Sequence, residues 1–196
     1  METHKQTWWD KEIKSQFNEF QSWVGSSQAD SKKIMRKFIA EQGFKSVVDI
    51  GCGICDDYFV YKNEYPDILW IGVEPSKFLH NLAIEKDIPV KNEEGHYTSL
   101  SYSGVNVAYS RHVLEHQEDF KPILNEMIRI AEHMVIHTFF IKPRNEKIIN
   151  YNEKNNLYHN TYSKPEIEEF LKEHNKVKDF TWKPLTGPEE ALIIKL

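Results

Sequence analysis

A glycine-rich turn directly follows a short apolar run near residue 50. Val47-Val48-Asp49-Ile50 is a candidate buried strand, and Gly51-Cys52-Gly53 interrupts it. Glycine permits unusual backbone angles and lets a ligand approach the main chain closely. A helix expected to begin near Asp56 would add free N–H groups and a positive dipole end, which suit a carboxylate. By itself, such a turn is weak evidence for any particular ligand.

An acidic residue stands where a ribose would bind. The run Ile68-Leu69-Trp70-Ile71-Gly72-Val73 predicts a second strand, and Glu74 follows it, 25 positions after Asp49. An acidic residue roughly 20 positions beyond a glycine-rich turn is placed to bind both hydroxyls of a ribose. A carboxylate has enough lone pairs to accept both. The alternative is a solvated glutamate at a strand end, but the upstream turn favours the ribose interpretation.

A third polar group ends another predicted strand, which spans residues 105–110 and leads into Ser110-Arg111-His112. Ligands of open α/β sheets bind outside the carboxyl ends of the strands, so we expect these side chains to face the cleft. Histidine is the commonest base at neutral pH. His112, His116 and His137 are therefore candidate general bases. Each could instead be a packed histidine that bonds a nearby carbonyl or carboxylate.

These residues need a scaffold, and short β-rich runs alternate with helical stretches along the chain. This alternation predicts a Rossmann-like, doubly wound α/β fold, in which a parallel sheet carries helices on both faces with right-handed crossovers. Strands are expected at 46–50, 68–73, 88–90, 105–110, 134–141, 177–182 and 191–196. Helices are expected at 8–24, from 30 or 31 to about 42, from about 56, at 76–85, at 119–132 and after the capping residue Ser163.

The sequence resembles the class I S-adenosylmethionine-dependent methyltransferases. Asp49-Ile50-Gly51-Cys52-Gly53 matches the first motif of that family, and Gly72-Val73-Glu74-Pro75-Ser76 matches the second. Val113-Leu114-Glu115-His116 resembles the segment that follows the fourth strand in many small-molecule and glycan-type members. The motifs cover roughly residues 45 to 141 and are specific as a set. The family fold implies a seven-stranded, mostly parallel sheet with an antiparallel last strand.

The resemblance implies S-adenosylmethionine as the cofactor. The glycine-rich turn would run beside its methionine part, Glu74 would bind its ribose, and Glu93 would fall near the adenine amino group. The cofactor-binding residues implied in this way are Asp49, Gly51, Cys52, Gly53, Glu74, Pro75, Glu93, Ser110, Arg111 and His112. Two positions depart from the family pattern. Cys55 replaces the third glycine of the first motif, and Asn106 stands where many members carry Asp.

Methyl transfer demands little chemistry from the protein, because the sulfonium is already activated. The enzyme mainly aligns a nucleophile with the methyl group, and a hydroxyl nucleophile also needs a base. We therefore expect methylation of oxygen or nitrogen on a small-molecule or glycan-like acceptor, with His112 or His137 as the base. No Asp/His cluster has ligand spacing, so we expect no metal.

The composition of the chain limits the classes of protein to which it can belong. A chain of 196 residues with 40% hydrophobic residues favours one domain, with N-terminal helices at 1–42 and the core at 43–196. The net charge of −5 disfavours nucleic acid. No apolar run approaches the ~18 residues of a membrane span, and two cysteines are too few for a disulfide framework. We therefore expect a cytoplasmic protein that does not bind membranes.

Two segments have open interpretations. The aromatic-rich stretch over residues 8–24 forms either a lid over the cleft or a helix packed on the sheet. The polar, Asn-rich segment over residues 142–162 is expected to be irregular. Its position after a strand's carboxyl end suits substrate contact, although a surface loop is the alternative.

Other functions remain as alternatives. Cys52-Gly53-Ile54-Cys55 is a C-x-x-C at a strand-to-helix turn, the position of a thioredoxin-like redox pair. A nicotinamide-binding dehydrogenase would need a third glycine where Asp56 stands. A structural zinc site would need two further ligands. A methyltransferase fold can also hold the cofactor, or nothing, and act through a partner.

Overall fold

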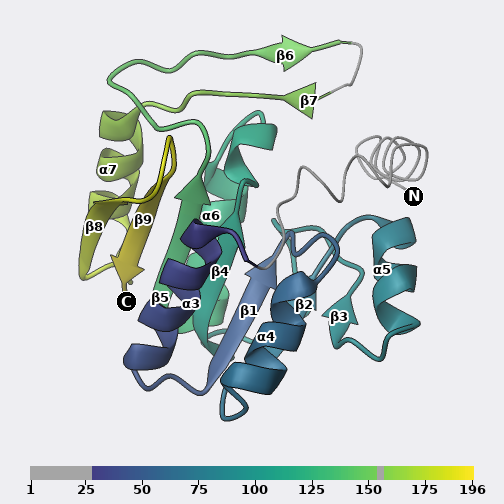
Figure 1. Cartoon of the computed structure of the whole chain (residues 1–196). Coiled ribbons are helices and arrows are strands. Elements are labelled where there is room, and N and C mark those ends of the chain that lie inside the picture. Colours follow the sequence, from purple (N-terminus) through teal and green to yellow (C-terminus); the bar gives the residue numbers. More distant parts are fainter. Residues whose placement is uncertain (1–27, 154–156) are drawn as a thin grey trace.

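The computed structural model describes residues 28–153 and 157–196. The helix expected over residues 8–24, and its role as a lid or packed helix, lie outside the described residues. The described chain forms a central sheet with helices on both faces and a small hairpin at one end (Figure 1).

The central sheet has seven strands in the order β3-β2-β1-β4-β5-β9-β8. Strand β9 runs antiparallel to the other strands of this sheet, as expected for the last strand. The strand order reverses between β1 and β4, so the crevice of a doubly wound sheet lies at the carboxyl ends of these strands. The strands are β1 (Ser46–Ile50), β2 (Leu69–Val73), β3 (Val90–Lys91), β4 (Val105–Arg111), β5 (Ala131–Phe139), β8 (Asp179–Pro184) and β9 (Glu190–Lys195).

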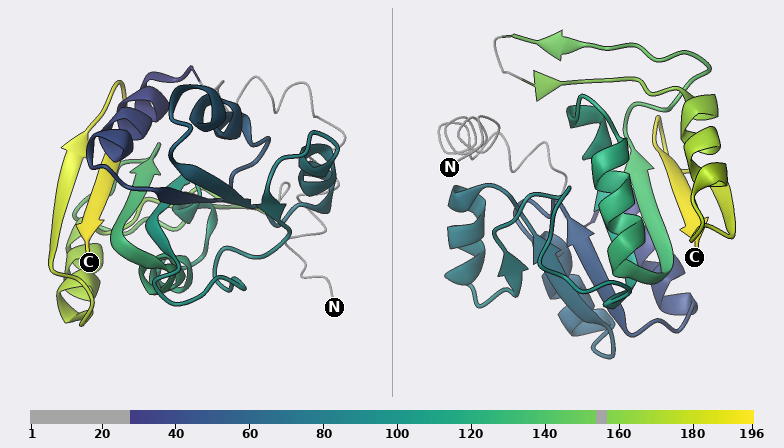
Figure 2. Two further views of the ribbon diagram at one scale, coloured as in Figure 1. Left: turned by 90° about the horizontal axis from the view of Figure 1, so that it is seen from below. Right: turned by 180° about the vertical axis from the view of Figure 1, so that it is seen from behind.

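Helices cover both faces of the sheet (Figure 2). Helices α3 and α4 lie on one face, and α6 and α7 lie on the other. A short 3₁₀ helix, η1 (Leu114–His116), joins β4 to α6. The α-helices are α3 (Asp30–Glu41), α4 (Asp56–Glu64), α5 (Lys77–Ile84), α6 (Lys121–Ile130) and α7 (Lys164–Glu173).

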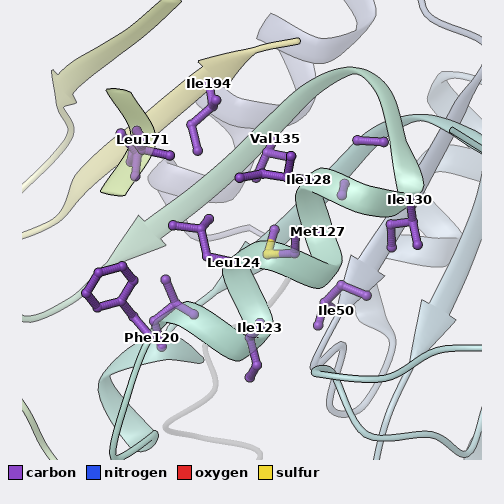
Figure 3. Close-up of a cluster of buried hydrophobic side chains, with 14 of the residues drawn as sticks. Ile50, Phe120, Ile123, Leu124, Met127, Ile128, Ile130, Val135, Leu171 and Ile194 are labelled. Atoms are coloured by element: carbon purple, nitrogen blue, oxygen red, sulfur yellow. The ribbon is translucent and has the colours of Figure 1, made fainter. Parts of the chain in front are cut away.

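The larger apolar core lies between the sheet and helix α6 (Figure 3). Helix α6 buries Ile123, Leu124, Met127 and Ile128, which follow the helical spacing expected from the sequence. Burial of each such side chain stabilises the fold by about 1.5–3 kcal/mol. This packing holds β4 and β5 side by side and so sets the positions of the residues at their carboxyl ends.

The predicted cap of one helix was confirmed and that of another was wrong. Ser163 caps α7 as expected, and its hydroxyl accepts the Glu166 N–H; Ser76 caps α5 in the same way through the Leu79 N–H. Helix α3 was expected to begin with a side-chain cap from Asp30 or Ser31. Its N-cap is instead Ala29, which makes no side-chain cap bond, and Ser31 is buried in the first turn.

The segment between β5 and α7 contains a two-stranded hairpin, so the expected irregular loop was wrong. The hairpin consists of β6 (Tyr151–Asn152) and β7 (Leu157–Tyr158) and lies over the carboxyl end of the sheet (Figure 1). The rings of Tyr151 and Tyr158 lie 4.8 Å apart. Strands of two residues are too short to show an alternating pattern, so the sequence carried no periodic signal for them.

Candidate functional site

The turn after β1 requires glycine at its first position. Gly51 has a φ angle of 72°, and an added Cβ would lie 2.6 Å from Cγ2 of Val113. Gly53 also has a positive φ angle, of 59°. The N–H groups of Gly51 and Cys52 donate to the Val73 carbonyl at 2.8 and 3.2 Å, so the turn is fastened to the end of β2.

Glu74 links the ends of β1 and β2. Its side chain is buried, with Oε2 accepting from the Gly53 N–H at 2.9 Å and Oε1 accepting from the Ser76 N–H at 2.9 Å. An ionised carboxylate offers about four acceptor sites. This carboxylate is therefore a candidate acceptor for vicinal hydroxyls at the ends of β1 and β2. The structure brings the predicted turn and the predicted acidic residue together.

The loop after β3 is joined to this group through Asn92. The Asn92 side-chain amide donates to the carbonyls of Glu74 and Pro75 at 2.9 and 3.0 Å. Glu93 accepts from the Ser99 N–H at 2.9 Å within its own loop. A role for Glu93 near an adenine therefore stays a prediction.

Asp49 is buried below the turn. Burial, followed by repulsion from Asp57, raises the pKa of Asp49 to about 8. Asp57 in turn is held by two buried cations, Lys32 and Arg36, from helix α3. The carboxyl group of Asp49 is therefore neutral near pH 7, and it favours folding at acid pH.

The Asp49→Asn variant should lose less stability than the wild type as the pH rises from about 5 to 8. The folded pKa lies above the unfolded value of about 3.9. The contribution of the Asp49 carboxyl group to the free energy of unfolding is therefore fully present below about pH 4. It is lost as the pH rises through 8. Urea denaturation at several pH values measures this slope. Parallel stability curves for the two proteins would contradict the assignment.

The two cysteines are close together but enclosed. Their Sγ atoms lie 3.3 Å apart, both side chains are buried, and both thiols are free. Burial raises the pKa of Cys52 well above its usual range, which disfavours the reactive thiolate. Cys55 has a φ angle of 60°, which is a left-handed conformation, at the position where the family has glycine.

Arg111 and His112 converge on a glutamate that sequence reasoning missed. The Arg111 Nη2 donates to Glu189 Oε1 at 2.7 Å, and His112 Nε2 bonds the same oxygen. Glu189 lies in the turn before β9, which the antiparallel pairing brings to the carboxyl ends of β4 and β5. Nothing near Glu189 in the sequence marked it as a site residue.

Burial of this group favours a neutral imidazole at His112. Burial alone would raise the pKa of Glu189, but hydrogen bonds from His112 and Ser31 and the Arg111 charge lower it to about 2. Burial lowers the pKa of His112 below its usual value. The ionised Glu189 therefore accepts the Nε2–H of a neutral His112, and Nδ1 carries the lone pair.

Ser110 and His137 lie in the interior instead of at the surface of the crevice. Ser110 Oγ is 2.6 Å from His137 Nδ1, and both side chains have 0% exposure. Successive residues of a strand point to opposite faces, so Ser110 faces the α6 side and Arg111 the α3 side. The predicted roles of the two side chains in cofactor binding and catalysis remain predictions.

An aromatic cluster completes this end of the sheet. The Phe140 ring centroid lies 4.9 Å from His112, 5.5 Å from His116 and 6.0 Å from His159. Burial lowers the pKa of His116, and its Nδ1 lies 2.8 Å from the Tyr158 carbonyl. Phe140 directly follows β5, so its position at a strand end was a signal that sequence reasoning overlooked.

Residues 28–153 and 157–196 contain neither a metal-binding cluster nor a membrane-spanning helix. No group of three or more His, Cys, Asp or Glu side chains in this part is arranged to hold a metal ion. No helix in it is both long enough and apolar enough to cross a membrane.

Solved structures share this fold at low sequence identity. A 1,6-didemethyltoxoflavin-N1-methyltransferase from Burkholderia thailandensis, with S-adenosylhomocysteine bound, has a TM-score of 0.68 at 14% identity, over 96% of this chain and 87% of that chain. A magnesium protoporphyrin IX methyltransferase from Synechocystis PCC 6803, also with S-adenosylhomocysteine bound, has a TM-score of 0.67 at 12% identity, over 97% of both chains.

A third similar structure is a SAM-dependent methyltransferase from Thermotoga maritima, with a TM-score of 0.63 at 15% identity, over 98% of this chain and 99% of that chain. No family model and no curated protein matches the sequence. At these identities the similarity concerns the fold. The chain therefore has the Rossmann-like fold of S-adenosylmethionine-dependent methyltransferases.

Proposed function

We propose that this protein is an S-adenosylmethionine-dependent methyltransferase. The observation that carries the proposal is the buried Glu74 carboxylate, which the Gly53 and Ser76 N–H groups hold at the carboxyl ends of β1 and β2. This is the position for ribose recognition in a doubly wound sheet. The presence of S-adenosylhomocysteine in two proteins of the same fold supports this cofactor.

The residues present fit that cofactor. The turn at Gly51 to Gly53 presents main chain without bulky side chains, and Glu74 supplies the acceptors for two hydroxyls. When bound, S-adenosylmethionine supplies an activated methyl group. Asp49, Cys52, Pro75, Glu93 and Arg111 remain proposed contributors through the motif match.

We propose oxygen or nitrogen of a small-molecule or glycan-like compound as the acceptor, with His112 as the general base. His112 combines a neutral imidazole, partial exposure and a carboxylate that orients it through Nε2. This arrangement leaves Nδ1 to take a proton from an acceptor hydroxyl. His137 is enclosed between Ser110 and Glu115 with no exposure, so it is the weaker candidate for this step.

The pH profile of turnover tests the role of His112. Because burial keeps the pKa of His112 below its usual value, the wild-type rate should be flat above pH 7 and fall below the His112 pKa. His112→Gln should be slower and lack this acid limb. The rate of S-adenosylhomocysteine formation with an acceptor found by screening measures both. An acid limb that persists in His112→Gln would assign the base elsewhere.

Calorimetric titration tests the cofactor. Purified protein should bind S-adenosylmethionine and S-adenosylhomocysteine at micromolar concentration and should not bind NADH. NADH binding alone would indicate a dehydrogenase. Binding of none of these ligands would overturn the proposal. Binding without turnover for any acceptor would favour a protein that holds the cofactor and acts through a partner.

A further inference from the structure

The Glu115 carboxylate is a buried junction between three parts of the fold. Glu115 lies in η1 and has 0% exposure. Its Oε1 accepts from the Phe140 N–H at 2.6 Å, where the chain leaves β5, and Oε2 lies 3.2 Å from His137 Nε2 inside β5. One side chain therefore bonds both a residue inside β5 and the residue that directly follows β5.

The main chain around Glu115 holds the hairpin segment in the same way. The Glu115 carbonyl accepts from the Asn160 N–H at 2.9 Å. The buried Tyr162 hydroxyl lies 2.9 Å from the Leu114 carbonyl and 2.6 Å from the Gln117 carbonyl. The short helix η1 thus anchors the segment directly after β7, which carries His159, and the His159 ring contacts Phe140 and His116.

The chemistry of the buried network of Glu115, His137 and Ser110 indicates where its protons lie. Burial by itself raises the pKa of Glu115, but the bond and charge of His137 bring it below its usual value, so the carboxylate is ionised. An ionised carboxylate only accepts, so His137 carries a proton on Nε2 and donates it to Glu115. Its Nδ1 lies 2.6 Å from the Ser110 hydroxyl oxygen.

This order of serine, histidine and carboxylate resembles a hydrolytic triad, but its burial excludes attack on a substrate. Ser110, His137 and Glu115 all have 0% exposure, and Ser110 also lies 3.4 Å from Met127 Sδ in the core. A nucleophile must reach the atom that it attacks. The network therefore serves the geometry of the site and not a covalent step.

We propose that Glu115 is a positioning residue for the acceptor side of the site, where it acts through Phe140 on the base His112. The Phe140 ring lies 4.9 Å from the His112 ring, and the Phe140 N–H is bonded directly to the Glu115 carboxylate. The proposal rests on the methyltransferase function and on His112 as its base. The ends of β1 and β2, where the cofactor is proposed to bind, make no use of this carboxylate.

The test compares Glu115→Gln with Glu126→Gln. Glu126 is a matched control, because its buried carboxylate also accepts a backbone N–H, from Thr98, but it pairs with Arg129 instead. Nitrogen-15 NMR reports the tautomer of His137 and the titration of His112. Calorimetry with S-adenosylhomocysteine reports the cofactor side. With an acceptor in hand, KM values for both substrates are measured.

In Glu115→Gln, the neutral amide oxygen accepts from the Phe140 N–H more weakly than the carboxylate does, so Phe140 is held less firmly, and the amide N–H faces His137. His137 should therefore change to the Nδ1–H tautomer and donate to Ser110. Loss of the nearby negative charge should lower the pKa of His112. Affinity for S-adenosylhomocysteine should stay within about twofold, and the acceptor KM should rise about tenfold, as misplacement of site groups predicts. Glu126→Gln should show none of these changes.

An unchanged His112 titration in Glu115→Gln would overturn the proposal, as would an equal loss of affinity for S-adenosylhomocysteine. If Glu115→Gln does not fold, Phe140→Leu provides the second test. That variant keeps the N–H bond to Glu115 but removes the ring, so the His112 pKa should rise toward its usual value. A His112 titration unchanged in Phe140→Leu would equally overturn it. A wild type that fails to bind S-adenosylhomocysteine would refute the function while the His137 tautomer still reports on Glu115.

Discussion

Glu74→Ala should weaken the binding of S-adenosylmethionine and S-adenosylhomocysteine more than 100-fold, or about 3 kcal/mol. The variant loses the acceptors proposed for two ribose hydroxyls. It also releases the Gly53 and Ser76 N–H groups, which the carboxylate holds at 2.9 Å each. Both losses affect the same ligand, so the effect should exceed that of a single hydrogen bond. Calorimetric titration of each ligand measures it.

Two further variants give this experiment its controls. Glu74→Gln keeps the shape of the side chain but directs an amide N–H toward a backbone N–H, so it should also bind weakly. Glu85→Gln changes an exposed glutamate at the end of α5 and should bind as the wild type does. Thermal denaturation verifies that each variant is folded. Wild-type affinity in a folded Glu74→Ala would remove the ribose assignment.

Asp57→Ala should reduce the free energy of unfolding by about 3–5 kcal/mol, because it leaves two buried cations without their counter-ion. Lys32 Nζ lies 2.9 Å from Asp57, and Arg36 donates to the other carboxylate oxygen. The side chains of these three residues are all less than a tenth exposed. Urea denaturation at pH 7 measures the loss.

An exposed ion pair on the same domain is the matched control. Asp67 pairs with Lys45 at 3.9 Å, and both side chains are largely exposed. Exposed pairs contribute little, so Asp67→Ala should leave the midpoint of denaturation nearly unchanged. Asp57→Ala should also lower the pKa of Asp49, because repulsion from Asp57 raises it. A loss below about 1 kcal/mol in Asp57→Ala would show that the cations find other partners or water.

The sequence alone was sufficient for the framework of the fold and for the proposed cofactor residues. Strands β1, β2 and β4 are short runs rich in apolar residues, which is typical of buried parallel strands. Gly51 and Glu74 lie at the ends of two such strands, and neighbouring parallel strands place their ends together. The signals are local in sequence, and the sheet converts them directly into proximity.

Side-chain direction was decided only by the tertiary structure. Ser110, Arg111 and His112 are consecutive, yet Ser110 joins His137 in the core while the other two bind Glu189. In α3, the apolar side chains of Ile34 and Phe38 are only half-buried. Lys32 and Arg36 are buried in their place because Asp57, on another helix, neutralises them.

The partners Glu189, Glu115 and Asp57 are the clearest case of information that the sequence by itself did not contain. Each bonds residues at least 20 positions away, across elements that become neighbours only when the sheet forms. Periodicity and turn chemistry act over one element at a time, so they determine strands, helices and strand ends. The bonds between buried charges depend on which elements pack together, and that choice belongs to the fold as a whole.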